Sequence, residues 1–427
     1  MTAMPNTAVP LYLPEHAANP QRSFALLRAQ GPVGLAEIDP GVYVWVITDY
    51  RAALDLFHDT TRTWTKDTRG WMEYLPPDSP ILPLVQWRPS LFFADDEEHA
   101  HLRKVLTDSF DLLDAQHVRD VTRRHADALL AEFAHTGRVD LISQYARLLS
   151  LMVLNSLFGM DDEYALDLIT AIESMMSTDL RTKAAGEQSF AKYLGTLYQM
   201  KAAKPGRDLT SWFIAHPNRL TQNEVINQIQ ITQGAAYETL AGFIANGFLR
   251  IATDERYRGT LTTGNLPIQH AIVDVLWTDP SLAMFSTHRP RRSITFHGRY
   301  IEAGAPVMVS YAAINTCPYA NQANDGHRSD RRAHLAFAAG PHECPARSIA
   351  EVITITAIER VTMRLPDIEL MVPKDELTYR PSPFYRILTS LPCRFTPRTD
   401  SGPQTVPWSQ RTAPSSQVAP QSVGLPA

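Results

Sequence analysis

The sequence has few cysteines, no long apolar run and little net charge. Three cysteines in 427 residues are too few and too scattered for a disulfide framework or a paired-cysteine zinc site, and they indicate a reducing compartment. No run of about 18 apolar residues, long enough to span a membrane, occurs. The opening residues also lack the basic start and apolar stretch of a signal peptide. We therefore expect a soluble, cytoplasmic protein with no membrane contact.

Charge and composition exclude further classes. The chain has 40 Lys and Arg against 45 Asp and Glu, a net charge of −5, so no global basic field attracts nucleic acid. With 44% hydrophobic and 20% charged residues, the composition is typical of a globular protein and not of a disordered or fibrous one. The length alone fits two or three domains, or one large domain with tails.

The pattern of residue types predicts a mainly α fold with a minor β region. Apolar residues recur at helical spacing across most of 97–252. Thr221 and Glu224 form a capping-box pattern ahead of an apolar run to Ile251, which predicts a long central helix of about 45 Å. A last helix is expected over 345–365. Short strands are expected at 41–48, 293–296, 300–301 and 307–310.

Cys344 stands out among the cysteines. It follows a turn at Gly340–Pro341 and directly precedes an expected helix whose first residue, Pro345, is of the type favoured there. Free N–H groups and the positive end of a helix dipole stabilise a thiolate, so this position can hold an anionic sulfur ligand. The alternative for a lone cysteine is a small buried apolar residue, and we assign that role to Cys317 and Cys393.

The residues around Cys344 resemble the haem-binding loop of the cytochrome P450 family. Phe337 is followed by Gly340, His342 and Cys344 at the spacing of that loop. The resemblance implies that Cys344 is the axial thiolate ligand of haem b, and thus the metal ligand. It also implies that Phe337 packs beside the sulfur and that His342 reaches a haem propionate. Ala346 stands where the family usually has glycine.

The resemblance covers about 31–395, nearly the whole chain. It implies a single cytochrome P450-like haem domain over 22–398, with the long central helix over the haem, and an N-terminal arm over 1–21. The remaining residues, 399–427, are rich in Ser, Pro and Gln and almost uncharged. Such a segment buries too little apolar area to offset the entropy of ordering it, so we expect a disordered tail.

Residues on the expected central helix resemble the family's oxygen-activating segment. Glu238 and Thr239 are its neighbouring acid and alcohol. The resemblance implies that Thr239 hydrogen-bonds dioxygen and that Glu238 relays protons from solvent, so both are catalytic candidates. Ala236, in place of the usual glycine, would lie beside the cofactor and alter the local helix kink. The alternative is an ordinary Glu-Thr pair on a solvated helix face.

His99 and Arg103 resemble the pair that binds haem propionates in the family. Their i, i+4 spacing places both on one face of a helix, and arginine forms charge-assisted hydrogen bonds with carboxylates. The alternative is a plain helix start rich in acidic residues. A third propionate partner is expected on the strand after Pro280, where Arg289 is the first candidate and His288 its rival.

One family motif is altered. The family nearly always has Glu-x-x-Arg on a buried helix before the haem loop, but here Asp274 and Trp277 occupy those positions. This resembles a minority of bacterial P450s that replace the arginine with tryptophan. Tryptophan has one N–H donor and no charge, so it cannot make the bidentate contact. Either Trp277 fills the space by packing while Asp274 caps neighbouring backbone, or haem retention is weakened; we favour packing. In the family a third residue usually joins this ion pair, and Arg328 is only a guess for that residue here.

The resemblance implies a haem-thiolate monooxygenase that inserts one oxygen atom from O2 into an apolar small organic molecule. An apolar loop that includes Trp71, Tyr74, Leu84 and Trp87 is expected to cover the substrate, although packing on the core explains each residue equally well. The alternative function is a haem-binding protein of the same fold without turnover, acting as a ligand binder or sensor. A haem-free helical protein is a third interpretation.

Electrons must come from outside, because the chain has no flavin or iron–sulfur motif. A ferredoxin and a ferredoxin reductase are therefore the expected partners. Lys104, Arg331, Arg332 and Arg347 flank the segments expected near the cysteine, where a basic patch would attract an acidic ferredoxin. Ordinary surface charge is the alternative. The substrate, the site of its oxidation and the oligomeric state do not follow from the sequence.

Overall fold

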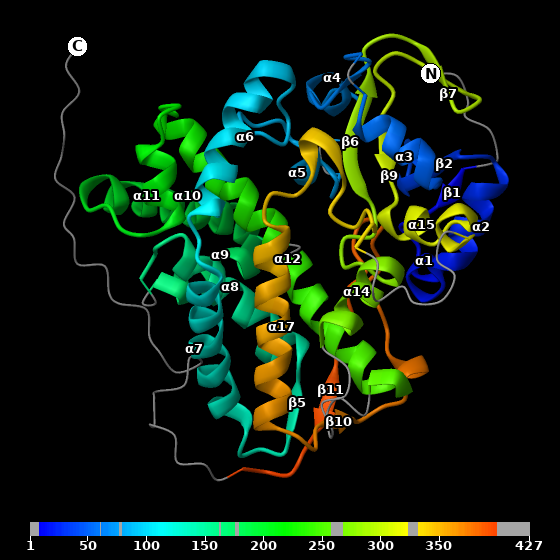
Figure 1. The fold of residues 1–427 in the computed structure, drawn as a ribbon. Helices are drawn as coiled ribbons and strands as arrows, with labels where there is room; N and C mark the ends of the chain where they lie inside the picture. The colour runs from blue at the N-terminus through cyan, green and yellow to red at the C-terminus, as the bar shows by residue number, and fades with distance from the viewer. Residues whose placement is uncertain are drawn as a thin grey trace.

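The computed structural model is mainly helical, with a smaller β region. Figure 1 shows the helices α7 to α11 on one side, the strands β1, β2, β6 and β9 on the other, and the helices α12 and α17 between them. Among the described residues, no helix is both long and apolar enough to cross a membrane. The structure describes residues 8–59, 61–76, 79–161, 164–175, 179–257, 268–322 and 332–398.

The larger sheet has six strands in the order β1-β2-β3-β9-β6-β4. Its middle strand β3 has the sequence Val-Tyr-Val-Trp-Val-Ile, in which buried and half-buried residues alternate, as expected of a strand that covers a core. Two smaller sheets have the orders β10-β11-β5 and β7-β8. The strands are β1 (Val9–Pro10), β2 (Val33–Asp39), β3 (Val42–Ile47), β4 (Trp64–Thr65), β5 (Arg138–Asp140), β6 (Phe285–Pro290), β7 (Ile294–Phe296), β8 (Arg299–Ile301), β9 (Val307–Val309), β10 (Glu369–Leu370) and β11 (Pro392–Arg394).

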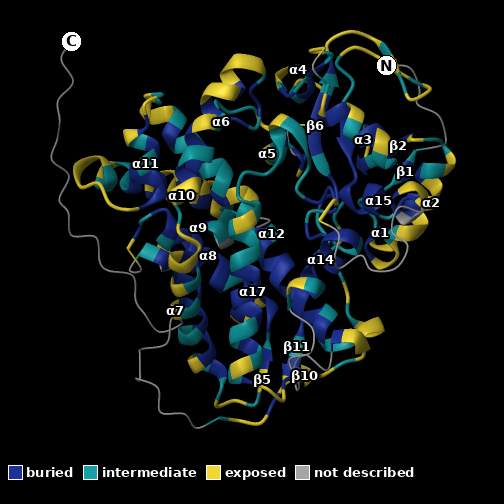
Figure 2. Ribbon diagram, in the orientation of Figure 1, coloured by how far each residue is buried: buried dark blue, intermediate teal, exposed yellow. Residues whose placement is uncertain are grey.

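The helix α12 (Gln222–Thr253) is the central helix. A capping box begins it, because the Glu224 carboxylate accepts the N–H of Thr221 at 2.7 Å while the Thr221 hydroxyl accepts the N–H of Glu224 at 3.3 Å. From Leu240 to Leu249 every residue is buried. Figure 2 shows buried residues gathered where α8, α12 and α14 meet. The second half of α12 is therefore the middle of the helical core.

The remaining helices surround this core or pack on the larger sheet. They are α1 (Pro14–Ala18), α2 (Pro20–Ala29), α3 (Tyr50–Phe57), α4 (Arg69–Met72), α5 (Leu82–Val85), α6 (Asp96–Asp111), α7 (Ala115–Phe133), α8 (Arg147–Leu157), α9 (Ala165–Met175), α10 (Leu180–Ala203), α11 (Leu209–Ala215), α14 (Ile268–Thr278), α15 (Tyr311–Asn315), α16 (Pro318–Gln322) and α17 (Arg347–Arg364). A short π-helical turn, Ile142–Ala146, leads into α8.

The expected central helix and all four expected strands are confirmed, but two boundaries were wrong. The helix after the cysteine begins at Arg347 and not at 345, because Ala346 has a turn conformation with φ −102° and ψ 17°. The expected arm over 1–21 does not end at a structural boundary, since its described part forms β1, α1 and the beginning of α2. The expected tail, 399–427, lies outside the described residues.

Candidate functional site

Cys344 lies in a tight loop between the sheet and α17. Its N–H donates to the carbonyl oxygen of Phe337 at 2.9 Å, and a single 3-10 turn, Gly340–His342, lies between them. The Phe337 ring packs edge-on against Phe243 of α12, with ring centroids 6.5 Å apart. This aromatic contact links the cysteine loop to the central helix.

Gly340 is needed where it stands. Its φ of +70° lies in the left-handed region, which glycine adopts without a steric penalty. A Cβ atom added there would lie 2.3 Å from the carbonyl oxygen of Phe57, at the end of α3. The loop is thus held closely against α3, and no larger residue fits without movement of the backbone.

Gly340→Ala is expected to lower the free energy of unfolding by about 1–3 kcal/mol. Gly298→Ala is the matched control, because Gly298 has a similar φ of +79° but no atom within 4 Å of an added Cβ. The control should lose only the free energy needed to hold an alanine in the left-handed conformation, roughly 1–2 kcal/mol. Urea unfolding of both variants measures the difference, and equal losses would show that the contact with Phe57 has no energetic weight.

The groups around the Cys344 sulfur shift the pKa of its thiol in opposite directions. Burial raises the pKa of the thiol above its ordinary value, whereas a hydrogen bond from the N–H of Ala346 and the nearby cations Arg103 and Arg347 lower it. The sequence argument assigned the stabilisation of a thiolate to free backbone N–H groups and to the helix dipole. In the structure α17 begins three residues after Cys344, so the Ala346 N–H and the two arginines are the stabilising groups next to the sulfur.

The middle of α12 exposes small residues although the helix crosses the core. Gly234 and Ala235 are exposed, and Ala236 and Thr239 are half-buried. A Cβ added at Gly234 would meet no atom within 4 Å. The Thr239 hydroxyl donates to the carbonyl oxygen of Ala235 at 2.7 Å. This part of the helix therefore has open space beside it, and the threonine oxygen remains able to accept another hydrogen bond.

Glu238 is buried and paired with two arginines. Its carboxylate accepts a hydrogen bond from Arg380 and lies 3.6 Å from a terminal nitrogen of Arg147 at the start of α8. Neither arginine was recognised from the sequence, because they lie far from Glu238 along the chain and carry no local signal. The two arginines orient the carboxylate and balance its charge inside the protein.

Three buried histidines gather beside the cysteine loop, and with Arg103 we call them the histidine cluster. The rings of His99 on α6 and His342 in the loop have centroids 3.9 Å apart, and His288 on β6 lies 6.5 Å from His342. Arg103, one turn after His99, donates to the carbonyl oxygen of Glu343. Burial lowers the pKa of His99 to about 4 and that of His342 to about 2. The histidines are therefore neutral at pH 7.

The structure brings His288, and not Arg289, to this cluster. Neighbouring side chains on a strand point to opposite faces, and Arg289 faces away. Its guanidinium donates to the carbonyl oxygens of Gly304 and Asp67, each at 2.8 Å. Arg289, the first candidate for the third propionate partner, thus bonds to backbone outside the cluster, whereas its rival His288 lies within it; the propionate contact itself stays a prediction.

Sequence reasoning missed Lys66, which follows β4 directly. Only 4% of its surface is exposed, and its ammonium donates to the Ser286 hydroxyl at 3.2 Å and lies 5.0 Å from the centre of the Phe92 ring. Burial lowers its pKa to about 7. A single lysine after a short β-type stretch is common on protein surfaces, so the sequence offered no sign that this one is buried.

The histidine cluster and Cys344 together fit a haem. Nε2 of His99 is buried without a hydrogen-bond partner among the described residues, which is rare for such an atom. Two carboxylates, as on the haem propionates, would accept hydrogen bonds from the histidine and Arg103. The thiol is a suitable iron ligand, and the small residues of α12 leave open space. The residues present therefore suit the cofactor that the resemblance implies.

The altered motif on α14 has its own set of contacts. We had expected Asp274 to cap backbone, but the partners that the described residues give its carboxylate are side chains: it accepts hydrogen bonds from Arg256 at 2.7 Å and from the Tyr257 hydroxyl at 2.8 Å. Trp277 is 3% exposed, and its ring meets that of His334 edge-on with centroids 6.0 Å apart. Trp277 thus packs α14 against the segment ahead of the cysteine, as expected. Arg328 lies outside the described residues.

A neutral hydrogen-bond bridge supports the same junction. The side-chain amide of Asn315 donates to the carbonyl oxygen of Leu276 at 3.1 Å, and its oxygen accepts the N–H of Leu335 at 2.8 Å. Asn315 is fully buried, so both bonds form away from water, where they stabilise more strongly. Packing and an amide bridge therefore join α14 to the cysteine segment.

The expected substrate loop divides into different environments. Trp71 is buried in a core cluster with residues of β2 and β3, and Leu84 packs against that cluster. Tyr74 is 80% exposed, and the Trp87 ring is covered by Arg69, whose guanidinium carbon lies 4.6 Å from the ring centre. For Trp71 the contacts favour packing on the core over a role in covering the substrate.

The expected basic patch is partly neutralised. Lys104 pairs with Asp108 at 2.7 Å and Arg347 with Glu351 at 3.1 Å. Arg332 is exposed, whereas Arg331 lies outside the described residues. These ion pairs reduce the positive charge that the surface offers to an acidic partner.

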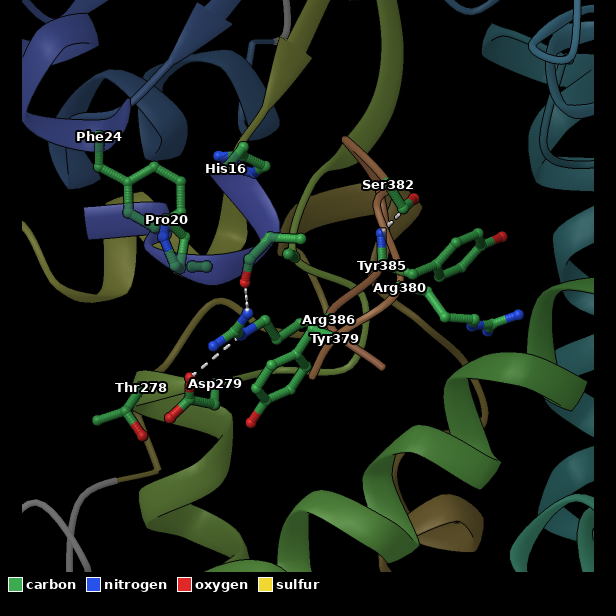
Figure 3. A pocket seen from close by; sticks show the side chains of 13 residues that line it. His16, Pro20, Phe24, Thr278, Asp279, Tyr379, Arg380, Ser382, Tyr385 and Arg386 are labelled. Atoms are coloured by element: carbon green, nitrogen blue, oxygen red, sulfur yellow. Dashed lines mark hydrogen bonds and ion pairs between the residues drawn. The ribbon is translucent and has the colours of Figure 1, made fainter. Parts of the chain in front are cut away.

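A small recess lies between α1, the end of α14 and the chain around Tyr379–Arg386 (Figure 3). Arg386 donates to the carbonyl oxygen of Ala17, lies 3.7 Å from the Asp279 carboxylate and stacks on Tyr379. None of the residues that line the recess belongs to the cysteine loop. Because its charged groups contact one another, we assign it the structural role of attaching α1 to the rest of the protein.

Comparison with characterised proteins supports the interpretation. No family model matches the chain. The chain is 27% identical to 2-hydroxy-5-methyl-1-naphthoate 7-hydroxylase of Streptomyces carzinostaticus over 86% of its own length and 93% of that protein. It is 28% identical to vitamin D(3) 25-hydroxylase of Pseudonocardia autotrophica, with 89% and 95% covered. The cytochrome P450 monooxygenase PikC of Streptomyces venezuelae is 26% identical, with 92% and 94% covered.

Solved structures agree in fold. CYP154C4 from Streptomyces sp. W2061 superimposes with a TM-score of 0.79 at 23% identity, over 90% of this chain and 97% of that one. CYP154A1 from Streptomyces coelicolor A3(2) gives a TM-score of 0.76 at 24% identity, over 91% and 100%. The curated relatives, the fold and the cysteine loop agree, and the chain is similar to bacterial cytochrome P450 monooxygenases over nearly its whole length.

Proposed function

We propose that this P450 inserts one oxygen atom from O2 into an apolar small organic molecule, with haem b held by Cys344 and electrons supplied by a ferredoxin and its reductase. The observation that carries the proposal is the placing of Cys344 beside a cluster of buried donors, below a central helix with open space at its small residues. When bound, the haem supplies the redox chemistry that activates dioxygen. The second oxygen atom leaves as water, which consumes two electrons and two protons.

The protein's own residues manage these protons. The Thr239 hydroxyl already donates to the Ala235 carbonyl oxygen. Its oxygen can therefore accept a hydrogen bond from a proton donor and hold that donor next to the open space. Glu238 supplies the nearest buried carboxylate. To relay a proton it must exchange the contact with Arg147 or Arg380 for a water molecule. The longer, 3.6 Å contact with Arg147 is the weaker of the two, so we expect the exchange on that side.

The alternative function is a haem-binding protein of the same fold that does not turn over a substrate. Neither the contacts of Asp274 nor the recess near Arg386 gives separate support to it. Turnover distinguishes the two functions. Purified protein is given a surrogate ferredoxin system and a compound that shifts the haem spectrum, and product and oxygen consumption are measured together. Haem-bound protein that forms no product with any such compound would favour the alternative, a ligand binder or sensor.

Thr239→Ala is expected to reduce product formed per oxygen consumed, on the order of 10²-fold if proton delivery contributes as general acid–base groups usually do. Thr253→Ala is the matched control, because the Thr253 hydroxyl makes the same kind of bond, to Leu249 at 2.8 Å, at the far end of α12. Oxygen uptake and product are measured for both. Equal coupling in the two variants would contradict the role of Thr239.

A further inference from the structure

Lys66 is the most unusual charged residue of the described structure. Its ammonium has three N–H donors, yet the described residues offer it one neutral acceptor, the Ser286 hydroxyl at 3.2 Å. The face of the Phe92 ring lies on another side. A lysine is almost never fully buried unless it is paired with an opposite charge. The described residues therefore give this lysine no directly bonded counter-charge.

The nearest carboxylate does not fill that role. Asp95 accepts hydrogen bonds from the Thr65 hydroxyl, from the backbone N–H of Lys66 at 2.8 Å and from Arg291 at 3.0 Å. Its charge is thus engaged by the backbone and by another cation. Asp95 still raises the pKa of Lys66 through space, but burial outweighs it and the pKa is lowered to about 7.

The backbone of β6 has an irregular shape that brings the polar side chains of Ser286 and His288 close to Lys66. The strand has a register shift between Phe285 and His288, and Ser286 has a φ of +81°, in the left-handed region that serine rarely adopts. The Ser286 hydroxyl lies 2.9 Å from Nδ1 of His288. One serine therefore connects Lys66 to the histidine cluster, and such local strain is typical of binding sites.

We propose that Lys66 is the second cationic partner of the haem propionates, with Arg103 as the first. The inference rests on the haem site proposed above. Charge balance supports it, because the two cations Lys66 and Arg103 then meet two carboxylates. The hydrogen bond from Lys66 to Ser286 and the 2.9 Å contact of Ser286 with His288 place the ammonium beside the cluster.

The test measures how fast haem leaves the protein for an excess of apomyoglobin. Lys66→Met keeps the length of the side chain without its charge and is expected to release haem faster, on the order of 10- to 100-fold, as loss of a charge-assisted hydrogen bond predicts. Lys66→Arg restores a charge and should release it more slowly than Lys66→Met. Lys104→Met is the control, because Lys104 is exposed and paired with Asp108; its rate should equal that of the wild type.

Haem dimethyl ester, whose propionates carry no charge, separates a propionate contact from a general loss of structure. With this ester, Lys66→Met and the wild type should release the cofactor at equal rates. A variant that releases both cofactors faster than the wild type, or neither, would overturn the proposal. A wild type that binds haem without the absorption of a thiolate complex would refute Cys344 as ligand and leave the Lys66 comparison valid. Protein that binds no haem would overturn both proposals.

Discussion

Cys344→Ser is expected to abolish the absorption band of the reduced, carbon monoxide-bound protein from which the P450 family takes its name. That band requires a thiolate on the iron, and an uncharged serine hydroxyl cannot replace it. The sulfur also lies at the end of a loop that Phe337 and Gly340 hold in place, so no other cysteine can move into its position. The measurement is a reduced difference spectrum with and without carbon monoxide.

Cys317→Ser is the control for this experiment. Cys317 is 1% exposed and packs against Trp277, away from the cysteine loop. The substitution buries a hydroxyl and costs some stability, about 1–3 kcal/mol, but the band should remain. Retention of the band by Cys344→Ser, or its loss in Cys317→Ser at unchanged haem content, would show that the ligand has been wrongly assigned.

Trp277→Arg, which introduces the arginine of the Glu-x-x-Arg motif with which this segment was compared, is expected to lower both haem content and stability. The side chain at position 277 is buried among Val273, Cys317 and Ala320, and the nearby carboxylate of Asp274 already pairs with Arg256 and Tyr257. A buried guanidinium without a free partner costs roughly 3–5 kcal/mol. Haem content is read from the ratio of haem to protein absorbance, and stability from thermal unfolding.

Two further variants make the Trp277 experiment decisive. Trp277→Phe keeps an aromatic ring against His334 and should retain haem, because the ring contact with His334 is the role we assign to Trp277. Arg256→Gln in the Trp277→Arg background frees Asp274 for the new guanidinium one helical turn away and should recover part of the loss. Higher haem content in Trp277→Arg than in the wild type would show that the tryptophan does not compensate for the missing ion pair.

Local patterns account for the features that the sequence predicted well. The capping box of α12 and the strands β3, β7, β8 and β9 depend on residues within a few positions of one another, so the periodicity alone identifies them. The loop from Phe337 to Cys344 is likewise one short segment with a specific spacing. His99 and Arg103 share a helix face for the same reason, one turn of the helix.

The errors arose where a decision depended on distant parts of the chain. The helix after Cys344 begins at Arg347 because tertiary contacts hold Ala346 in a turn, which Pro345 alone does not reveal. Arg289 and His288 are adjacent in the sequence, and a register shift against β9 decides which of them faces the histidine cluster. Asp274 was expected to meet backbone, and its side-chain partners come from the segment that follows α12.

The sequence by itself determined the class of fold, the central helix and the cysteine loop, because these depend on hydrophobic periodicity and on closely spaced residues. Only the tertiary structure decided which charges meet. Arg147 and Arg380 reach Glu238 from separate segments, and Lys66 joins the histidine cluster through a bulge in β6. A buried charge is stable only beside a suitable partner, and that partner is chosen by the folding of distant segments, which no local pattern records.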